Sequence, residues 1–223
     1  MQPVGTVVAF GAAPTQAAAA LDATALACDI LPGGNDLFSR IKRANGGSLL
    51  LLLAEESGDP ALAAAAKAAH ILHRRGGGEA VLVLPAVPAL PGPQARTRLD
   101  RAAALTGACV VQPVGRASWG DAVRCFVEPL AVFGLIGVES AEVHRLLRPR
   151  ACLLHLWDDE ALDPSLGDAH DVMVTCRLRP NATLREVDAA ARRVKSATDA
   201  PLLLAGPEVG ADEGPAAIAA LFL

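Results

Sequence analysis

Glu139 and Glu142 are two acidic residues, three positions apart, whose spacing is compatible with chemistry on one face of a helix. They stand in the stretch GLIGVESAEVHRLL, where a glycine-containing turn precedes an apolar-periodic segment. That pattern predicts that the two residues open a helix, whose first backbone N–H groups attract negative charge. Two carboxylates on one helical face could also polarise a water molecule for hydrolysis. Both roles, helix stabilisation and catalysis, are open at this point.

A second group of acids follows a strongly apolar run. Glu55, Glu56 and Asp59 lie in AEESGDP, whose first residue ends the run LLLLLA. Ligands of open parallel sheets bind beyond the carboxyl ends of the strands, and phosphate-binding loops there carry glycines and available N–H groups. Here carboxylates take those positions, and Asp59 before a proline predicts an N-capped helix start. The sequence contains neither GxxxxGK[ST] nor GxGxxG, so this turn favours helix capping over phosphate binding.

The histidines and cysteines do not form a recognisable site. His70 and His73 are three apart on one predicted helix, but no third ligand stands beside them. An exposed helix face is therefore favoured over a metal site. Ser57 precedes a glycine without the GxSxG pattern of a nucleophile elbow. The five cysteines are dispersed without a CxxC spacing, which indicates a reduced, cytoplasmic setting.

Short apolar runs alternate with helical segments along most of the chain. Strands are predicted at 5–10, 49–54, 80–84, 108–112, 150–156, 171–178, 202–205 and 216–222. Helices are predicted at 14–28, around 37–41, and at 59–75, 94–106 and 118–132, with two more opened by Glu139 and by the capping box Thr183–Glu186. The proline-rich stretch 85–93 is predicted to be a loop, and the acidic stretch 158–168 a break.

This order of elements predicts an α/β fold. The runs 49–54 and 80–84 are continuously apolar, which is typical of central strands covered on both faces. We expect a mostly parallel, Rossmann-like sheet with helices on both faces, joined by a central helix to a small α+β C-terminal unit. The expected parts are a nucleotide-binding-like domain (1–117), the central helix with its following loop (118–148) and the α+β domain (149–223).

Composition excludes some classes of function. The formal net charge is −4, and no run of Lys or Arg compensates for it, which argues against a nucleic-acid binder. With five Phe, two Trp and no Tyr, stacking platforms for bases are also few. Apolar runs are far shorter than the ~20 residues that span a bilayer. Because the start of the chain has no signal-peptide pattern, we expect a cytoplasmic protein without membrane insertion.

The segment 133–143, FGLIGVESAEV, resembles the synergy loop of FtsZ, the bacterial homologue of tubulin, whose family form is PGLxNxDxADV. Residues 172–209 resemble the family's carboxy-terminal run of strand, turn, (L/N)TLxEVxxAA helix and strand. Residues 48–87 resemble its strand, phosphate loop, helix and strand. The resemblance covers 48–223 and implies the fold of the tubulin superfamily. In that family GTP lies between subunits, and the synergy loop of one subunit completes the site of the next.

The resemblance also assigns the candidate site residues. The two catalytic Asp positions of the family are Glu139 and Glu142 here, and Gly137 stands where the family has Asn. The family's GGGTGTG loop is reduced to AEESGDP, and its first glycine-rich loop to FGAA. The residues that would still contact a nucleotide are Gly11, Ala12, Ser57 and Gly58.

From these departures we expect an FtsZ/tubulin-like protein that has lost GTP hydrolysis and acts as a binding, regulatory or self-associating module. No cofactor is expected, with GTP as the one candidate. The expected partner is a second copy or another protein, by a surface other than the filament contact, because that contact would bring acids against acids. Two alternatives remain: an active GTP-binding GTPase, and a generic α/β protein that binds a small molecule at its strand ends.

Overall fold

The structure is a computed structural model that describes residues 5–10, 12–19, 28–32, 49–55, 58–75, 78–131, 134–136, 138–157, 167–176, 183–207 and 217–223. The strands are β1 (Gly5–Phe10), β2 (Cys28–Pro32), β3 (Leu49–Ala54), β4 (Glu79–Val83), β5 (Cys109–Pro113), β6 (Gly134–Ile136), β7 (Ala151–Trp157), β8 (Asp171–Cys176), β9 (Leu202–Pro207) and β10 (Ala217–Phe222). The helices are α1 (Ala12–Ala19), α3 (Asp59–Arg74), α4 (Pro93–Thr106), α5 (Trp119–Ala131), α6 (Ser140–Leu146) and α7 (Leu184–Ala197).

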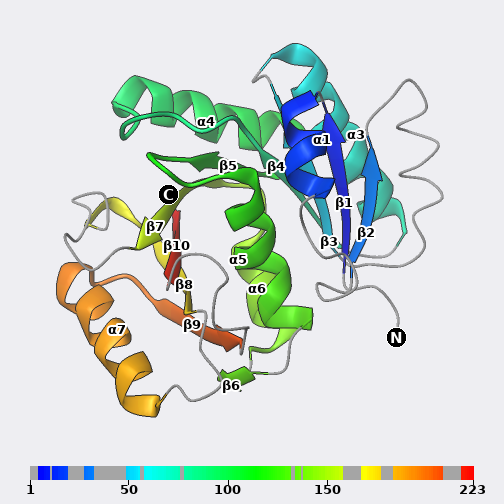
Figure 1. The fold of residues 1–223 in the computed structure, drawn as a ribbon. Helices are drawn as coiled ribbons and strands as arrows, with labels where there is room; N and C mark the ends of the chain where they lie inside the picture. Colours follow the sequence, from blue (N-terminus) through cyan, green and yellow to red (C-terminus); the bar gives the residue numbers. More distant parts are fainter. Residues whose placement is uncertain are drawn as a thin grey trace.

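The strands lie side by side in the order β2-β1-β3-β4-β5-β7-β10-β8-β9-β6. From β2 to β7 every neighbouring pair is parallel, as expected for strands joined by helical crossovers. β10 is antiparallel to both of its neighbours, β7 and β8, while β8 and β9 are parallel. The last strand of the chain therefore sits inside the sheet, between two strands that precede it in sequence (Figure 1).

Helices cover both faces of the sheet, and each face has its own apolar cluster. Side chains of α3, α4 and α7 pack in one cluster, and those of α1, α5 and α6 in the other. The strand β3 contributes to both apolar clusters: Leu50 and Leu52 lie in the first cluster, while Leu51 and Leu53 lie in the second. All six residues of β3 are buried, and each buried leucine side chain contributes about 1.5–3 kcal/mol of transfer free energy.

The central helix α5 contains a proline, and a side chain of the neighbouring sheet replaces the helical hydrogen bond that this proline removes. Pro129 has no N–H, so the carbonyl of Cys125, four residues earlier, loses its usual helical donor. The hydroxyl of Thr175 in β8 donates a hydrogen bond to that carbonyl at 3.1 Å. Figure 1 shows α5 in the middle of the molecule, against strands of its carboxy-terminal part. The contact ties the helix to that part.

The structure confirms the predicted fold class. The strands predicted at 49–54 and 80–84 are the parallel neighbours β3 and β4, and the predicted central helix is α5. The small unit of strand, helix and two strands is β8-α7-β9-β10. All of these strands belong to one hydrogen-bonded sheet. The division of the chain into three parts stays a prediction.

Several local predictions were wrong. The helix predicted at 14–28 ends at Ala19, and Cys28 begins β2, a short strand that among the described strands pairs only with β1. β6 was missed because three residues are too few to show a period. The strand predicted to alternate over 171–178 is buried throughout its six described residues, since α5 and α7 cover its two faces. The short helix around 37–41 and most of the acidic break lie outside the described residues.

Candidate functional site

Glu55 lies at the carboxyl end of β3, where the sequence predicted a degenerate phosphate loop. β1 and β3 are parallel neighbours with Phe10 aligned on Ala54, so the residues that follow them emerge side by side. The Oε2 atom of Glu55 accepts a hydrogen bond from the backbone N–H of Ala12 at 2.9 Å. Ala12 is the first residue of α1. The carboxylate thus lies at a helix start that favours anions.

The start of α3 differs from the sequence-based expectation. Its N-cap is Gly58, with extended backbone (φ −81°, ψ 176°), and Asp59 is the first helical residue. The carbonyl of Gly58 accepts hydrogen bonds from the N–H groups of Ala61 (3.1 Å) and Leu62 (3.3 Å), but no side chain caps the helix. The prediction that Asp59 is the N-cap was therefore wrong. Pro60 has no N–H and therefore needs no acceptor in this first turn, so the helix start has one donor fewer for a side-chain cap to satisfy.

Two of the four predicted nucleotide-binding residues can be placed. The N–H of Ala12 is already hydrogen-bonded to Glu55. Gly58 has room for a side chain, since a Cβ built on it would lie 3.6 Å from its nearest neighbour, the Cδ atom of Pro60. Packing against the rest of the protein therefore does not require glycine there. Gly11 and Ser57 lie outside the described residues, as does Glu56.

Glu139 and Glu142 are brought together at the start of α6. Glu139 is the N-cap, and the two residues form a reciprocal capping box. The backbone N–H of Glu139 donates to the Oε2 atom of Glu142 at 3.3 Å. Both side chains are exposed. This geometry gives the pair the helix-stabilising role left open by the sequence, and a role in polarising water stays a prediction.

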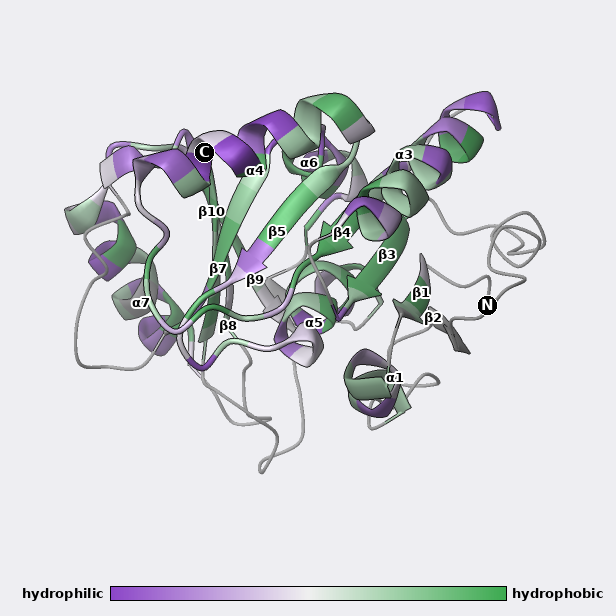
Figure 2. Cartoon of the chain, turned by 90° about the horizontal axis from the view of Figure 1, so that it is seen from above, coloured by the Kyte–Doolittle hydropathy of each residue, from purple (hydrophilic) through white to green (hydrophobic). Residues whose placement is uncertain are grey.

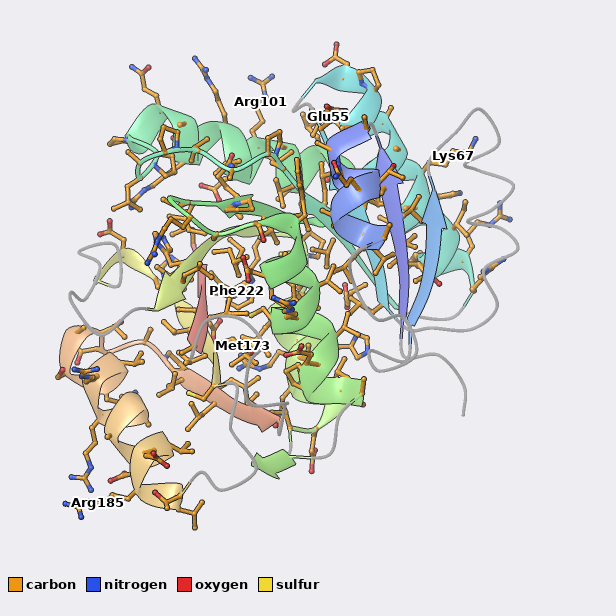
Figure 3. All side chains as sticks on the ribbon, viewed as in Figure 1. Glu55, Lys67, Arg101, Met173, Arg185 and Phe222 are labelled. Carbon is orange, nitrogen blue, oxygen red and sulfur yellow. The ribbon has the colours of Figure 1, made fainter. Side chains whose placement is uncertain are left out.

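The two groups of carboxylates lie at opposite ends of the parallel strands. β3, β4, β5 and β7 all run in the same direction. Glu55 follows the carboxyl end of β3, at the top of Figure 3, whereas α6 leads into the amino end of β7. A single molecule therefore does not assemble Glu55, Glu139 and Glu142 into one site.

The described residues offer little for metal or acid–base chemistry. Among them, no cluster of three or more His, Cys, Asp or Glu side chains could hold a metal ion. His70 and His73 are both exposed on α3, in agreement with the preferred interpretation of their spacing. Burial lowers the pKa of His144.

An open cavity of about 300 Å³ lies between residues 167–169 and 195–200, at the amino ends of β8 and β9 rather than at the carboxyl ends where a ligand was expected.

Three of the described cysteine thiols are buried where ionisation is disfavoured. Cys109, Cys125 and Cys152 are fully buried in the cluster that contains α5. Burial raises the pKa of the Cys109 and Cys125 thiols to about 12, and the pKa of Cys152 is raised well above its ordinary value for the same reason. A thiol must ionise to act as a nucleophile or metal ligand, so these side chains serve packing.

The contact between Glu55 and Ala12 was not predicted from the sequence. From the sequence, Glu55 was expected in the electrostatic field of α3, the next helix along the chain, whereas it accepts a hydrogen bond from the start of α1. The sequence did show that Ala12 and Glu55 each follow a predicted buried strand, at 5–10 and 49–54. The contact could be predicted only with the further knowledge that these two strands are neighbours in the sheet.

Comparison with solved structures identifies the fold. The chain superposes on FtsZ from M. jannaschii with a TM-score of 0.67 and 16% identity, covering 100% of this chain and 88% of that one. CetZ from Methanosaeta thermophila gives 0.61 at 8% identity, covering 98% and 86%, and CetZ2 from Haloferax volcanii gives 0.57 at 13%, covering 98% and 91%. No protein-family model and no curated protein matches the sequence. The chain therefore has the FtsZ/tubulin fold, as the resemblance implied, and identities this low establish the fold alone.

Proposed function

We propose that this chain, which has the FtsZ/tubulin fold, does not hydrolyse GTP and acts as a nucleotide-independent binding and self-associating module. The observation that carries this proposal is the hydrogen bond from the Ala12 N–H to the Glu55 carboxylate. The anion that the start of α1 favours is supplied by the protein itself. A nucleotide phosphate would have to displace this carboxylate or share the site with it.

The energetic cost of sharing the site is large. Two like charges 4 Å apart at an effective dielectric constant near 20 repel by about 4 kcal/mol, roughly a thousandfold in affinity. Asp59 adds a second negative charge in the first turn of the neighbouring helix α3. Micromolar binding corresponds to about −8 kcal/mol, so this repulsion would push such an affinity into the millimolar range.

The positions of Glu139 and Glu142, the two predicted catalytic residues, also support the proposed loss of GTP hydrolysis. Glu142 already accepts the N–H of Glu139 in a helix cap. Both side chains are engaged at the start of their own helix, so the geometry favours their structural role over positioning a water molecule.

The proposed self-association uses a different surface from the head-to-tail contact. A head-to-tail contact would bring the edge that carries Glu55 and Asp59 against the edge that carries Glu139 and Glu142. Like charges facing each other disfavour that arrangement. Two-fold pairing through an apolar surface is the simplest alternative.

Isothermal titration of GTP with Mg²⁺ into the protein, together with a phosphate-release assay, tests the loss of nucleotide function. We expect no binding of micromolar affinity and no phosphate release by the natural chain. Glu55→Gln removes the negative charge at the start of α1, and Asp100→Asn is a control with the same change in charge on another helix, α4. Micromolar GTP binding by the natural chain would contradict the proposed loss of nucleotide binding. Phosphate release that disappears on Glu139→Gln or Glu142→Gln would establish the active GTPase instead.

Light scattering and negative-stain microscopy, each with and without GTP and Mg²⁺, test the association. We expect monomers or dimers whose size does not depend on nucleotide. Long filaments with a subunit repeat would contradict the proposed loss of the head-to-tail contact.

A further inference from the structure

The helices α3 and α4 carry a charge opposite in sign to that of the whole chain. The formal net charge of the protein is −4. These two helices and the C-cap of α3 contain only two acids, Asp59 and Asp100. Their basic residues are Lys67, Arg74, Arg75, Arg96, Arg98 and Arg101. The rest of the molecule is correspondingly more acidic, so the protein is electrostatically polarised.

The two helices lie next to each other on the same face of the sheet. Both enter the same apolar cluster through their inner sides. A Cβ built on Gly107, the C-cap of α4, would lie 3.8 Å from the Cβ of Ala69 in α3, so the last turn of α4 approaches the second half of α3. Figure 2 shows the two helices on the same side of the strands, with hydrophilic and hydrophobic residues on their ribbons.

The exposed side of α4 combines positive charge with an apolar side chain. Arg98, Arg101 and Leu105 are spaced three and four residues apart and therefore share one helical face. All three are exposed, and Leu105 is 72% exposed, the highest value among the large hydrophobic residues of the described part. On α3, Lys67 and Arg74 are seven residues apart and exposed as well. Figure 3 shows Arg101 and Lys67 pointing outward from their helices.

We propose that this α3–α4 surface (Lys67, Arg74, Arg98, Arg101 and Leu105) docks the protein on an anionic phospholipid bilayer. A bilayer presents negative charge over a plane, which matches cations distributed over two neighbouring helices better than a groove-shaped ligand would. It also accepts an alkyl side chain such as Leu105 below the headgroups. Neither helix contains an aromatic residue, and base stacking, which single-stranded nucleic acid would offer, therefore has no platform there.

This docking is peripheral. Among the described residues, no helix has the length and apolar character that a membrane crossing requires. The affinity for the bilayer comes from surface charge and from one shallow apolar contact. It should fall as the salt concentration rises, because the Debye length shortens from about 10 Å at 0.1 M salt to about 3 Å at 1 M. It does not depend on nucleotide and is independent of the function proposed above.

Co-sedimentation with vesicles tests the proposal. The probes are vesicles of phosphatidylcholine mixed with phosphatidylserine, and vesicles of phosphatidylcholine alone. We expect salt-sensitive binding to the first and none to the second. Each arginine near an anionic surface contributes about fivefold to the partition, so Arg98→Gln/Arg101→Gln should weaken binding about 25-fold.

The matched control is Arg185→Gln/Arg193→Gln, which removes the same charge from α7. Figure 3 shows Arg185 at the opposite end of the molecule from Arg101. This variant should bind within twofold of the natural chain. Leu105→Ser keeps the charge and should weaken binding to vesicles. Circular dichroism of each variant verifies that it is folded.

Equal binding to neutral vesicles, no binding to either vesicle, or equal losses in the α4 and α7 variants would each overturn the proposal. Duplex DNA provides the last comparison. Binding to DNA that depends on Arg98 and Arg101 but not on Leu105, without binding to vesicles, would assign the surface to nucleic acid instead.

Discussion

The hydroxyl of Thr175 donates a hydrogen bond to the main-chain carbonyl of Cys125 at 3.1 Å. Pro129 leaves that carbonyl without its helical donor, and Thr175 is fully buried, so no water from the surface replaces the bond. A side chain of β8 thus completes the hydrogen bonding of the central helix. The contact joins the parallel part of the sheet to its carboxy-terminal part through α5.

Thr175→Val should lower the free energy of unfolding by about 1–3 kcal/mol, because the shape is kept while a buried carbonyl loses its donor. In a Pro129→Ala background, residue 129 regains an N–H that can donate to Cys125. The same Thr175→Val change should then cost less than about 1 kcal/mol. Urea unfolding of the four proteins gives the coupling energy directly. Equal costs in the two backgrounds would show that the hydroxyl does not replace the missing helical donor.

Glu142→Ala should destabilise α6 by about 1 kcal/mol, because it removes one half of the capping box with Glu139. Glu142→Gln should be nearly neutral, since a glutamine oxygen still accepts the N–H of residue 139. Thermal unfolding followed by circular dichroism compares the two variants. A loss of stability in Glu142→Gln as large as that in Glu142→Ala would mean that the negative charge, rather than the cap, stabilises the helix start.

Thr183→Ala should lower the free energy of unfolding by about 1 kcal/mol, because it removes the hydroxyl that accepts the N–H of Glu186 in the capping box of α7 and donates to the Glu186 carboxylate at 3.1 Å. Arg192→Ala on the same helix removes an exposed ion pair with Asp188 (2.8 Å) and should cost about 0.5 kcal/mol or less. Chemical denaturation of both variants ranks the two contacts. The reverse order would show that surface charge matters more than capping in α7.

Cys109 and Cys125 should resist alkylation by iodoacetamide in the native protein at pH 8. With a pKa of about 12, roughly one thiol in 10,000 is ionised at that pH, against about a quarter of ordinary cysteines. Peptide mapping by mass spectrometry, with a urea-unfolded sample as the reference, measures the difference. Rapid native labelling of either residue would contradict their burial.

The same two thiols should make the protein less stable at alkaline pH. In the unfolded chain they ionise above about pH 8.5, whereas in the folded state they stay protonated up to about pH 12. The folded state therefore binds more protons between these values, and the free energy of unfolding should fall as the pH rises through that window. Urea titrations at pH 8 and pH 10 check this sign, with a Cys109→Ala/Cys125→Ala variant showing a smaller fall.

Local signals in the sequence were reliable where neighbouring residues decide the structure. The five-leucine run 49–54 is β3, and the capping box Thr183–Glu186 opens α7 as predicted. The start of α3 was misassigned by one residue, because a proline after an acid fits two cap positions equally well. The edge strand β2 was missed because its structure depends on a partner strand rather than on its own residues.

The sequence by itself determined the alternation of strands and helices, the caps that start two helices, and the acids that follow the strand 49–54. These features act over a few residues along the chain. Tertiary structure alone decided that Glu55 binds the start of α1, 43 positions away, and that Thr175 completes a helix 50 positions away. It also placed the basic residues of α3 and α4 on neighbouring helices of one face of the sheet, although the chain has no basic run and is acidic overall. The order of strands in the sheet sets which distant residues meet, and that order follows from packing the apolar faces of all the elements at once.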